Sequence, residues 1–227
     1  FVLPMTSLLF LLSAPHPWWA SLPWLLVVVA SIAIDMQSPG ERRQPAATMP
    51  GWPFDTVLYL LFALQIVTVG LLVRMVALHG VFATDTLVGL LLVGINSGYS
   101  GLVVAHELIH RSSRSMQQLG RVLLASVLYE HFYTEHVRGH HMRVGTGNDP
   151  ATSRFAEHPG RFFLRTVPAP FRSAWRLEAK RLADADMPWW DPRLVRSRVV
   201  HGIVLEWSVA LAILVALGPG PFAIFLL

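Results

Sequence analysis

The sequence predicts an all-α membrane protein, a polytopic transmembrane helical bundle with a basic cytoplasmic helical region. Hydrophobic residues make up 53% of the 227 residues and charged residues only 14%, whereas soluble proteins have about 25% charged residues. Fifteen of the 18 lysines and arginines lie between Arg111 and Arg198, flanked by apolar runs. This distribution is typical of a loop attracted to an anionic membrane leaflet, and it argues against a nucleic-acid partner.

Four apolar runs are long enough to cross a bilayer, whose core of ~30 Å requires about 20 helical residues. They comprise residues 18–36, 55–78, 86–105 and 199–217. Residues 1–12 and 221–227 are expected to be parts of a fifth and a sixth span, cut at the ends of the chain. We therefore predict a single membrane domain, 1–227, truncated at both ends. Within it we expect transmembrane helices in 1–110 and 199–227 and a cytoplasmic region with a histidine box in 111–198.

The loops between these runs predict an orientation. Arg42 and Arg43 lie in the linker 37–53, two predicted spans before the basic region, so both loops can face the cytoplasm. The apolar segment 119–129 is only eleven residues long, so we expect it to be buried or interfacial. Residues 161–182 mix aromatic and basic side chains, which predicts a helix at the membrane surface.

Five of the ten histidines fall into two clusters, and these are the candidate metal ligands: His106, His110, His136, His140 and His141. In each cluster two histidines are four residues apart, so on a helix their imidazoles lie ~40° and about one turn from each other. His141 follows His140 by ~100° and is expected to point elsewhere. A cluster that faces two directions favours a pair of metal ions over a single ion. The chain contains no cysteine, so any metal ion must be held by histidine or carboxylate.

Three further residues stand near these ligands. Glu107 and Glu135 are adjacent to histidines, and we expect them to orient the imidazoles or to balance the charge of the metal. His131 precedes the second cluster but does not share its spacing. We expect it to support the ligands rather than to bind metal.

A zinc metalloprotease is a distant alternative, because residues 106–110 match H-E-x-x-H. A single zinc ion requires about three protein ligands, however, whereas this chain offers five histidines in two clusters. Imidazole suits zinc, copper and iron alike, so the residue types leave the metal open. A transporter with intramembrane histidines is less favoured, because the clusters stand at helix ends and not at the membrane midplane.

Four segments together resemble the membrane alkane 1-monooxygenases, part of the membrane fatty-acid desaturase and hydroxylase superfamily. Residues 106–111 read H-E-L-I-H-R, where the family has H-E-L-G-H-K. Residues 135–141 keep every fixed position of its E-H-x-x-G-H-H box. Residues 149–154 resemble its D-P-A-[ST]-S-R run, and residues 174–178 its A-W-x-L-E segment.

The resemblance implies a six-span enzyme with a non-haem di-iron centre at the cytoplasmic face of the bacterial inner membrane. Such an enzyme inserts one atom of dioxygen into a terminal C–H bond of an apolar chain. Its electrons come from rubredoxin and rubredoxin reductase. The resemblance makes the five histidines iron ligands, with Asp149 as a supporting residue, and it places the remaining ligands beyond residue 227.

Departures from the family pattern leave the substrate open. Ile109 and Arg111 replace the usual glycine and lysine of the first box, and Glu130 stands where the family often has glycine. Fatty-acyl desaturases and hydroxylases and xylene-type monooxygenases share the same boxes, so they remain alternatives. The basic stretch 161–181 could bind an acidic partner such as rubredoxin or an anionic lipid surface.

Overall fold

A computed structural model describes residues 1–38, 40, 49–182 and 187–227. These residues form helices and no β-strand, which confirms the all-α prediction. The chain divides into two compact units, one formed by Phe1–Leu108 with Ala210–Leu227 and the other by Ile109–Val209. Arg42 and Arg43, on which the predicted orientation of the first linker depends, lie outside the described residues.

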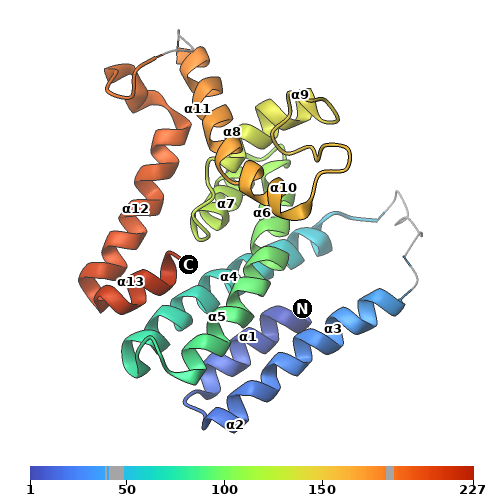
Figure 1. The fold of residues 1–227 in the computed structure, drawn as a ribbon, viewed down its shortest axis with the longest axis vertical. Helices are drawn as coiled ribbons and strands as arrows, with labels where there is room; N and C mark the ends of the chain where they lie inside the picture. Colours follow the sequence, from blue (N-terminus) through green and yellow to red (C-terminus); the bar gives the residue numbers. More distant parts are fainter. Residues whose placement is uncertain (39, 41–48, 183–186) are drawn as a thin grey trace. The chain divides into compact units, whose positions relative to one another are not determined.

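The first unit is a bundle of apolar helices (Figure 1). Its helices are α1 (Val2–Ser13), α2 (Trp18–Ser21), η1 (Leu22–Trp24), α3 (Leu25–Gln37), α4 (Trp52–His79), α5 (Thr84–Asn96), η2 (Ser97–Leu102), α6 (Val103–Ile109), the end of α12 (Arg198–Leu217) and α13 (Pro219–Phe225). Helices α1, α4 and α5 pack on one another, and α13 packs on α4. The run that begins at Trp18 stays helical through Pro23, because this proline falls in the 3-10 turn η1 at a helix start, where no backbone N–H is needed.

Four helical stretches are long and apolar enough to cross a membrane: Trp18–Gln37, Trp52–His79, Thr84–Ile109 and Arg198–Leu217. Each coincides with a predicted span to within a few residues. The third extends four residues beyond its prediction, so His106 lies on the last turn of a spanning helix and His110 directly follows that helix. The chain is an integral membrane protein.

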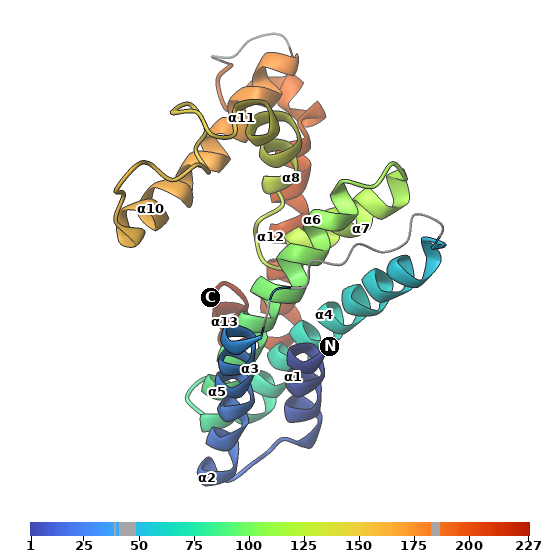
Figure 2. The ribbon, with the colours of Figure 1, turned by 90° about the vertical axis from the view of Figure 1, so that its right-hand side faces the viewer.

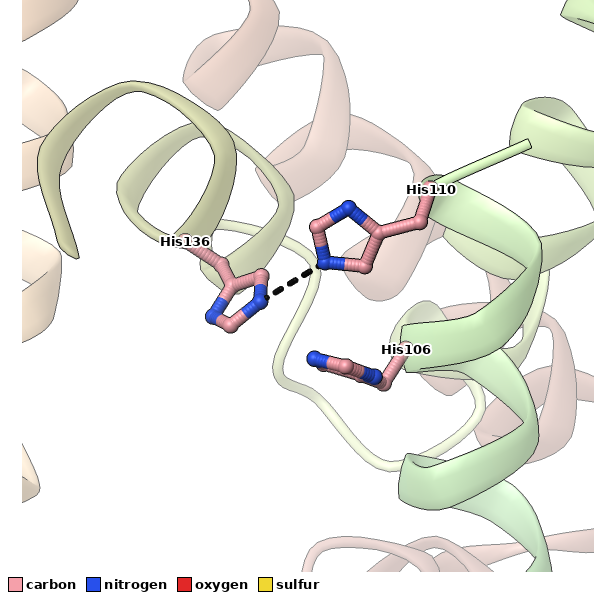
Figure 3. A group of neighbouring side chains, drawn as sticks. All are labelled: His106, His110 and His136. Atoms are coloured by element: carbon pink, nitrogen blue, oxygen red, sulfur yellow. Dashed lines mark hydrogen bonds between the residues drawn. The ribbon is translucent and has the colours of Figure 1, made fainter. Parts of the chain in front are cut away.

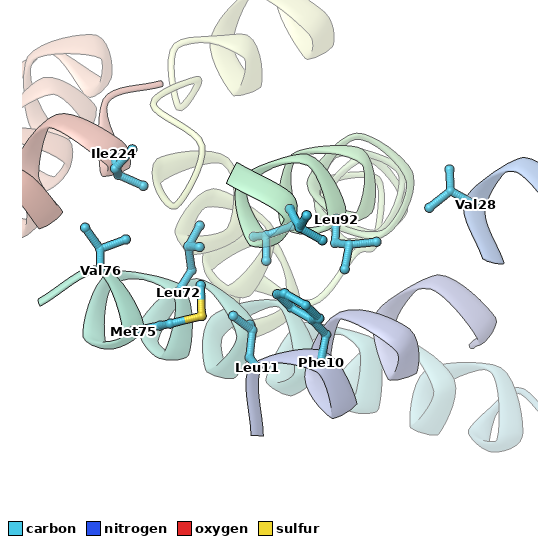
Figure 4. Packing of buried hydrophobic residues seen from close by; sticks show 10 residues of the cluster. Phe10, Leu11, Val28, Leu72, Met75, Val76, Leu92 and Ile224 are labelled. Atoms are coloured by element: carbon cyan, nitrogen blue, oxygen red, sulfur yellow. The ribbon is translucent and has the colours of Figure 1, made fainter. Parts of the chain in front are cut away.

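A buried apolar cluster holds this unit together (Figure 4). Phe10 from α1, Leu72 and Met75 from α4, and Leu92 from α5 are all at most 5% exposed. The close approach of α4 to α5 depends on Gly89, since a Cβ at this position would lie 2.8 Å from Met75 Cε. Small residues at such crossings let helix backbones approach closely in lipid, where dispersion contacts drive association.

The second unit consists of short helices, among them α7, α8, α10 and α11 (Figure 2). They are α7 (Arg114–Ala125), α8 (Phe132–Glu135), η3 (His136–His140), α9 (His141–Arg143), α10 (Pro159–Thr166), α11 (Pro168–Leu182), η4 (Pro192–Arg196) and the start of α12. The apolar segment 119–129 forms the second half of α7 and the turn after it, with Leu123 and Leu124 fully buried. Residues 161–182 form two helices, of which α11 packs on α8 and η3.

Candidate metal centre

The first histidine box stands on α6, and one histidine of the second box lies beside it (Figure 3). His106, His110 and His136 each offer a nitrogen, and the three nitrogens lie within 4.8 Å of one another. His110 Nε2 lies 3.0 Å from His136 Nε2. These are residues from two boxes that the sequence separates by 26 positions.

The second box is π-helical, and this changes which of its histidines point together. The segment η3 spans His136–His140, and a π-helix bonds residues five apart instead of four. His141 Nε2 accordingly lies 3.0 Å from His136 Nε2, and the His141 ring stacks on His110 with the centroids 4.7 Å apart. The expectation that His141 points elsewhere was therefore wrong, because it assumed α-helical rotation.

The nitrogens of His110, His136 and His141 fit a transition-metal ion. A nitrogen bound to such an ion lies ~2.1 Å from it, so two ligands at right angles are about 3.0 Å apart, as observed here. Hydrogen bonding explains the cluster less well. A ring nitrogen such as His136 Nε2 can donate one hydrogen bond or accept one. Two other nitrogens, His110 Nε2 and His141 Nε2, lie within hydrogen-bond distance of it. An all-imidazole donor set without thiolate suits iron, zinc or copper.

The Nδ1 atom of His140 faces Asp149 and not the other histidines. Its Nδ1 lies 2.9 Å from Asp149 Oδ2, and the carboxylate is only 3% exposed. Burial alone would raise the pKa of Asp149, but hydrogen bonds from Thr152, from the Ala151 backbone and from His140 outweigh it and lower the pKa. Asp149 is thus a carboxylate at neutral pH. It can accept a hydrogen bond from Nδ1–H of His140, which leaves Nε2 unprotonated as a metal ligand, an arrangement common around metal-bound histidine.

Arginine–carboxylate pairs fix the second box against α11. Arg143 donates to Glu135 Oε1 and to Ser173 Oγ, both at 2.7 Å. Arg138 donates to Glu178 Oε1 at 3.3 Å. The buried Glu178 also accepts bonds from Arg181 at 2.8 and 2.9 Å, and from the backbone N–H of Arg198 at 2.8 Å.

These pairs were not predicted from the sequence, although both ends of each pair lie in or beside a recognised segment. Arg138 lies within the second box, Arg143 follows it, and Glu178 ends the A-W-x-L-E segment. Their opposite charges were the available signal. Nothing in the sequence indicates which arginine faces which carboxylate.

The remaining predicted site residues lie in different surroundings. Glu107 is exposed, whereas Glu135 is buried and its pKa is raised by burial despite the nearby Arg143. His131 contacts the rings of Tyr129 and Phe171, and burial lowers its pKa to about 4, so it is neutral. The roles of these residues, like the metal ligands themselves, stay predictions.

Glu130, which departs from the family pattern, is fully buried beside α12. It forms an ion pair with Arg121, and its backbone N–H donates to Glu206 Oε1 at 2.7 Å. Gly202 leaves the space for this side chain, because any Cβ there would overlap the Glu130 carboxylate. Burial raises the pKa of Glu130 to about 7, although Arg121 opposes the shift. The sequence showed that Glu130 departs from the family pattern, but its partners Arg121 and Glu206 were not predicted.

Comparison with known proteins places these residues in a family. Residues 84–227, which include both histidine boxes, match the fatty acid desaturase family. Alkane 1-monooxygenase 2 of Pseudomonas aeruginosa is 32% identical over 218 residues, covering 81% of this chain and 56% of the relative. Alkane 1-monooxygenase 1 of the same organism is 42% identical over 110 residues, or 44% of this chain and 29% of the relative.

A third relative extends the comparison to another organism. Alkane 1-monooxygenase 1 of Alcanivorax borkumensis is 36% identical over 126 residues, covering 56% of this chain and 30% of the relative. The matched regions span at most about half the length of these curated relatives. The resemblance read from the histidine boxes is confirmed, and the chain belongs to the fatty acid desaturase family.

Proposed function

We infer that this chain is the histidine-box part of a membrane monooxygenase that hydroxylates the terminal carbon of alkanes or similar apolar chains. One observation carries the proposal: His136 Nε2 lies 3.0 Å from the Nε2 atoms of both His110 and His141, next to the end of a membrane-spanning helix. Three proteins similar to this chain in sequence are named alkane 1-monooxygenases.

The five histidines would bind two iron ions between them. His106, His110 and His136 would bind through their clustered nitrogens, and His141 would bind through Nε2, which lies 3.0 Å from His136 Nε2. His140 would bind through Nε2 while Asp149 accepts a hydrogen bond from its other nitrogen. Bound iron would supply the activation of dioxygen. Glu135 lies behind the box, paired with Arg143, so it would steady the helix rather than touch the metal.

The substrate would be apolar and would arrive from the bilayer. His106 and His110 stand at the end of the spanning stretch Thr84–Ile109, so an alkyl chain lying between spanning helices can bring its end to them without crossing water. The charge of Glu135, beside the second box, is paired with that of Arg143. Unpaired charge would oppose the approach of a hydrocarbon.

The test combines metal analysis with product analysis. In the full-length enzyme, His136→Ala should lose iron and terminal hydroxylation together. The matched control is His158→Ala, since His158 is exposed and its ring accepts a bond from the nearby Gly160 N–H. Full activity in His136→Ala, or a native enzyme that holds zinc instead of iron, would overturn the proposal.

A desaturase of the same family is the second candidate, because the family match itself covers 63% of the chain, 144 of 227 residues. Labelled dioxygen distinguishes the two activities. A hydroxylase leaves one labelled oxygen atom in the product, whereas a desaturase releases both as water and yields an alkene.

We further propose that rubredoxin, reduced by rubredoxin reductase, is the electron donor. It would bind at a basic cavity of the second unit. The cavity has a volume of about 460 Å³, and its cationic lining residues are Arg143, Arg154, Arg165, Arg172, Arg176 and Lys180. Arg172, Arg176 and Lys180 are exposed and recur every four residues along one face of α11. Such a stripe complements an acidic protein and speeds its association.

Charge reversal tests this docking surface. Arg172→Glu with Arg176→Glu should raise the KM for reduced rubredoxin by about tenfold or more at low salt, with a smaller effect at high salt. Turnover at saturating donor should change little. Arg161→Glu is the control, since Arg161 is exposed on α10 but does not line the cavity. An equal effect of both variants would argue for general charge attraction and against a docking site.

A further inference from the structure

The helix that carries the first histidine box is interrupted by a π-helical turn. Helix α5 ends at Asn96, η2 occupies Ser97–Leu102, and α6 continues to Ile109. A π-turn bonds residues five apart, so it absorbs one extra residue. Each α-helical residue advances the helix by ~100°. Side chains after the turn are therefore rotated by about that angle, relative to an uninterrupted helix.

The buried residues before and after the π-turn show this rotation of the helix face. Before the turn, the buried residues include Asp85, Val88, Gly89, Leu92, Val93 and Asn96. An uninterrupted α-helix would bury positions 103 and 107 next. Instead Val104, Ala105, Leu108 and Ile109 are buried, while Val103 is 57% exposed and Glu107 is also exposed. The buried face has moved by one residue, and the histidines have moved with it.

A buried amide on the neighbouring helix contacts the start of this turn. Gln65 of α4 is 0% exposed. Its Nε2 donates to Ser97 Oγ at 2.7 Å, and its Oε1 accepts a bond from Asn96 Nδ2 at 3.0 Å. Asn96 in turn accepts a bond from Ser100 Oγ at 3.0 Å. The side-chain amide of Gln65 thus bonds both Asn96, the last residue of α5, and Ser97, the first residue of η2.

The setting makes these bonds hard to replace. Gln65 and Asn96 both lie within spanning stretches and are fully buried. Inside a bilayer no water competes for a freed amide, and polar side chains kept there usually serve a function. Gly101 adds a steric limit, because a Cβ on it would lie 3.4 Å from Gln65 Cδ. The turn and the glutamine fit each other closely.

We propose that Gln65 is a positioning residue that holds the π-turn η2 and so sets the direction in which His106 and His110 leave their helix. The proposal rests on the proposed function in one respect, that these histidines bind metal. Without the turn, position 107 would move into the buried face, and His106 and His110 would leave the helix in a direction about 100° from their present one.

Three variants of the full-length enzyme separate positioning from ordinary packing. Gln65→Met keeps the length of the side chain and removes both bonds. Gln65→Glu is the rescue, because a carboxyl group buried in the membrane stays protonated and can still donate and accept one bond each. Thr68→Val is the control, since Thr68 is fully buried on α4 and its hydroxyl donates to the Gln65 carbonyl of its own helix, at 3.0 Å.

The expected result is a loss of iron affinity of about 10–100-fold in Gln65→Met, as for other residues that orient metal ligands. The iron spectrum should change as well. Gln65→Glu should regain most of the affinity, and Thr68→Val should lose little. Unchanged iron binding in a Gln65→Met protein that merely unfolds at a lower temperature would reduce Gln65 to a packing residue and overturn the proposal.

A readout without metal separates this inference from the proposed function. The chain has no cysteine, so single cysteines report accessibility cleanly. With native Gln65, Glu107→Cys should react with a maleimide and Ala105→Cys, at a 0% exposed position, should not. Gln65→Met should reverse both. If the pattern does not change, the positioning role is wrong even where the enzyme is an iron monooxygenase; if it reverses in a protein that holds no iron, only the metal assignment fails.

Discussion

Steric contacts explain why position 139 of the second box is a glycine. A Cβ at this position would lie 2.5 Å from Glu135 Oε2 and would also overlap the Arg143 guanidinium. The ion pair between these two side chains therefore passes directly over the glycine, inside the turn that carries the histidines. The box motif thus encodes a salt bridge behind the ligands as well as the ligands themselves.

Gly139→Ala should accordingly separate Glu135 from Arg143 and disturb the π-turn. Forcing a methyl group into such a contact costs about 1–3 kcal/mol, so we expect a lower unfolding temperature and less bound metal per chain. Gly147→Ala is the control, since a Cβ there would meet no described atom within 4 Å. Equal metal content in the two variants would show that the pair is dispensable.

Glu130 predicts a pH dependence of stability. Its pKa is raised from 4.5 to about 7 in the folded protein, so between these values the folded state holds a proton that the unfolded state has lost. Stability therefore falls as pH rises through this window, by about 3 kcal/mol at most. In detergent, the unfolding temperature should drop between pH 5 and pH 8, and Glu130→Gln should flatten that drop.

The control for this titration is Glu157→Gln. Hydrogen bonds from Arg165 lower the pKa of Glu157 to about 2, so it does not titrate between pH 5 and pH 8, and its removal should leave the slope unchanged. A slope that is as steep in Glu130→Gln as in the native protein would assign the pH dependence to another group.

At the scale of elements, α11 supports the second box through Glu178. This carboxylate is 1% exposed and joins Arg138 of the box, Arg181 of its own helix and the start of α12. Removing one member of a buried ion pair costs about 3–5 kcal/mol, and the partial exposure of both arginines, 34% and 35%, reduces this figure.

We therefore expect Glu178→Gln to destabilise the protein by about 2 kcal/mol, measured by thermal or denaturant unfolding in detergent. Asp191→Asn gives the comparison at the surface, where its partner Arg193 is 50% exposed and a pair contributes about 1 kcal/mol or less. Equal losses in the two variants would mean that Glu178 is no more than another surface charge.

The helices show where prediction from the sequence succeeds. Spanning segments such as Trp52–His79 were predictable because the bilayer imposes a length and an apolar composition on every span. The π-turns were not, since the expected directions of the histidines assumed α-helical rotation. The error was local, yet it misdirected His141, whose nitrogen in fact lies 3.0 Å from that of His136.

The candidate site shows the same division. Its histidines were found because their spacing repeats in two boxes, a pattern that the sequence displays directly. Gln65 and Glu178 were missed because each acts on a residue more than 30 positions away, Ser97 and Arg138. Such pairings depend on how helices pack, and an isolated glutamine in an apolar run carries no signal of its partner.

For the molecule as a whole, charge and hydrophobicity are divided between the two units. All 15 basic residues between Arg111 and Arg198 belong to the unit Ile109–Val209, while three of the four spanning stretches begin in the other unit. Basic segments that adjoin spans stay in the cytoplasm during insertion. This orientation would also present the basic cavity to a soluble electron donor.

Labelling of two single cysteines tests this orientation, in a chain that has no cysteine of its own. Phe82 lies between two spanning helices and is 95% exposed, and Phe155 lies in the basic unit and is 105% exposed. In intact spheroplasts, a membrane-impermeant maleimide should modify Phe82→Cys and leave Phe155→Cys untouched until the membrane is opened. The two substitutions match in type and exposure, so any difference reports the side of the membrane. The reverse pattern would place the histidine boxes outside the cell, where a cytoplasmic donor such as rubredoxin could not reduce a metal bound to them.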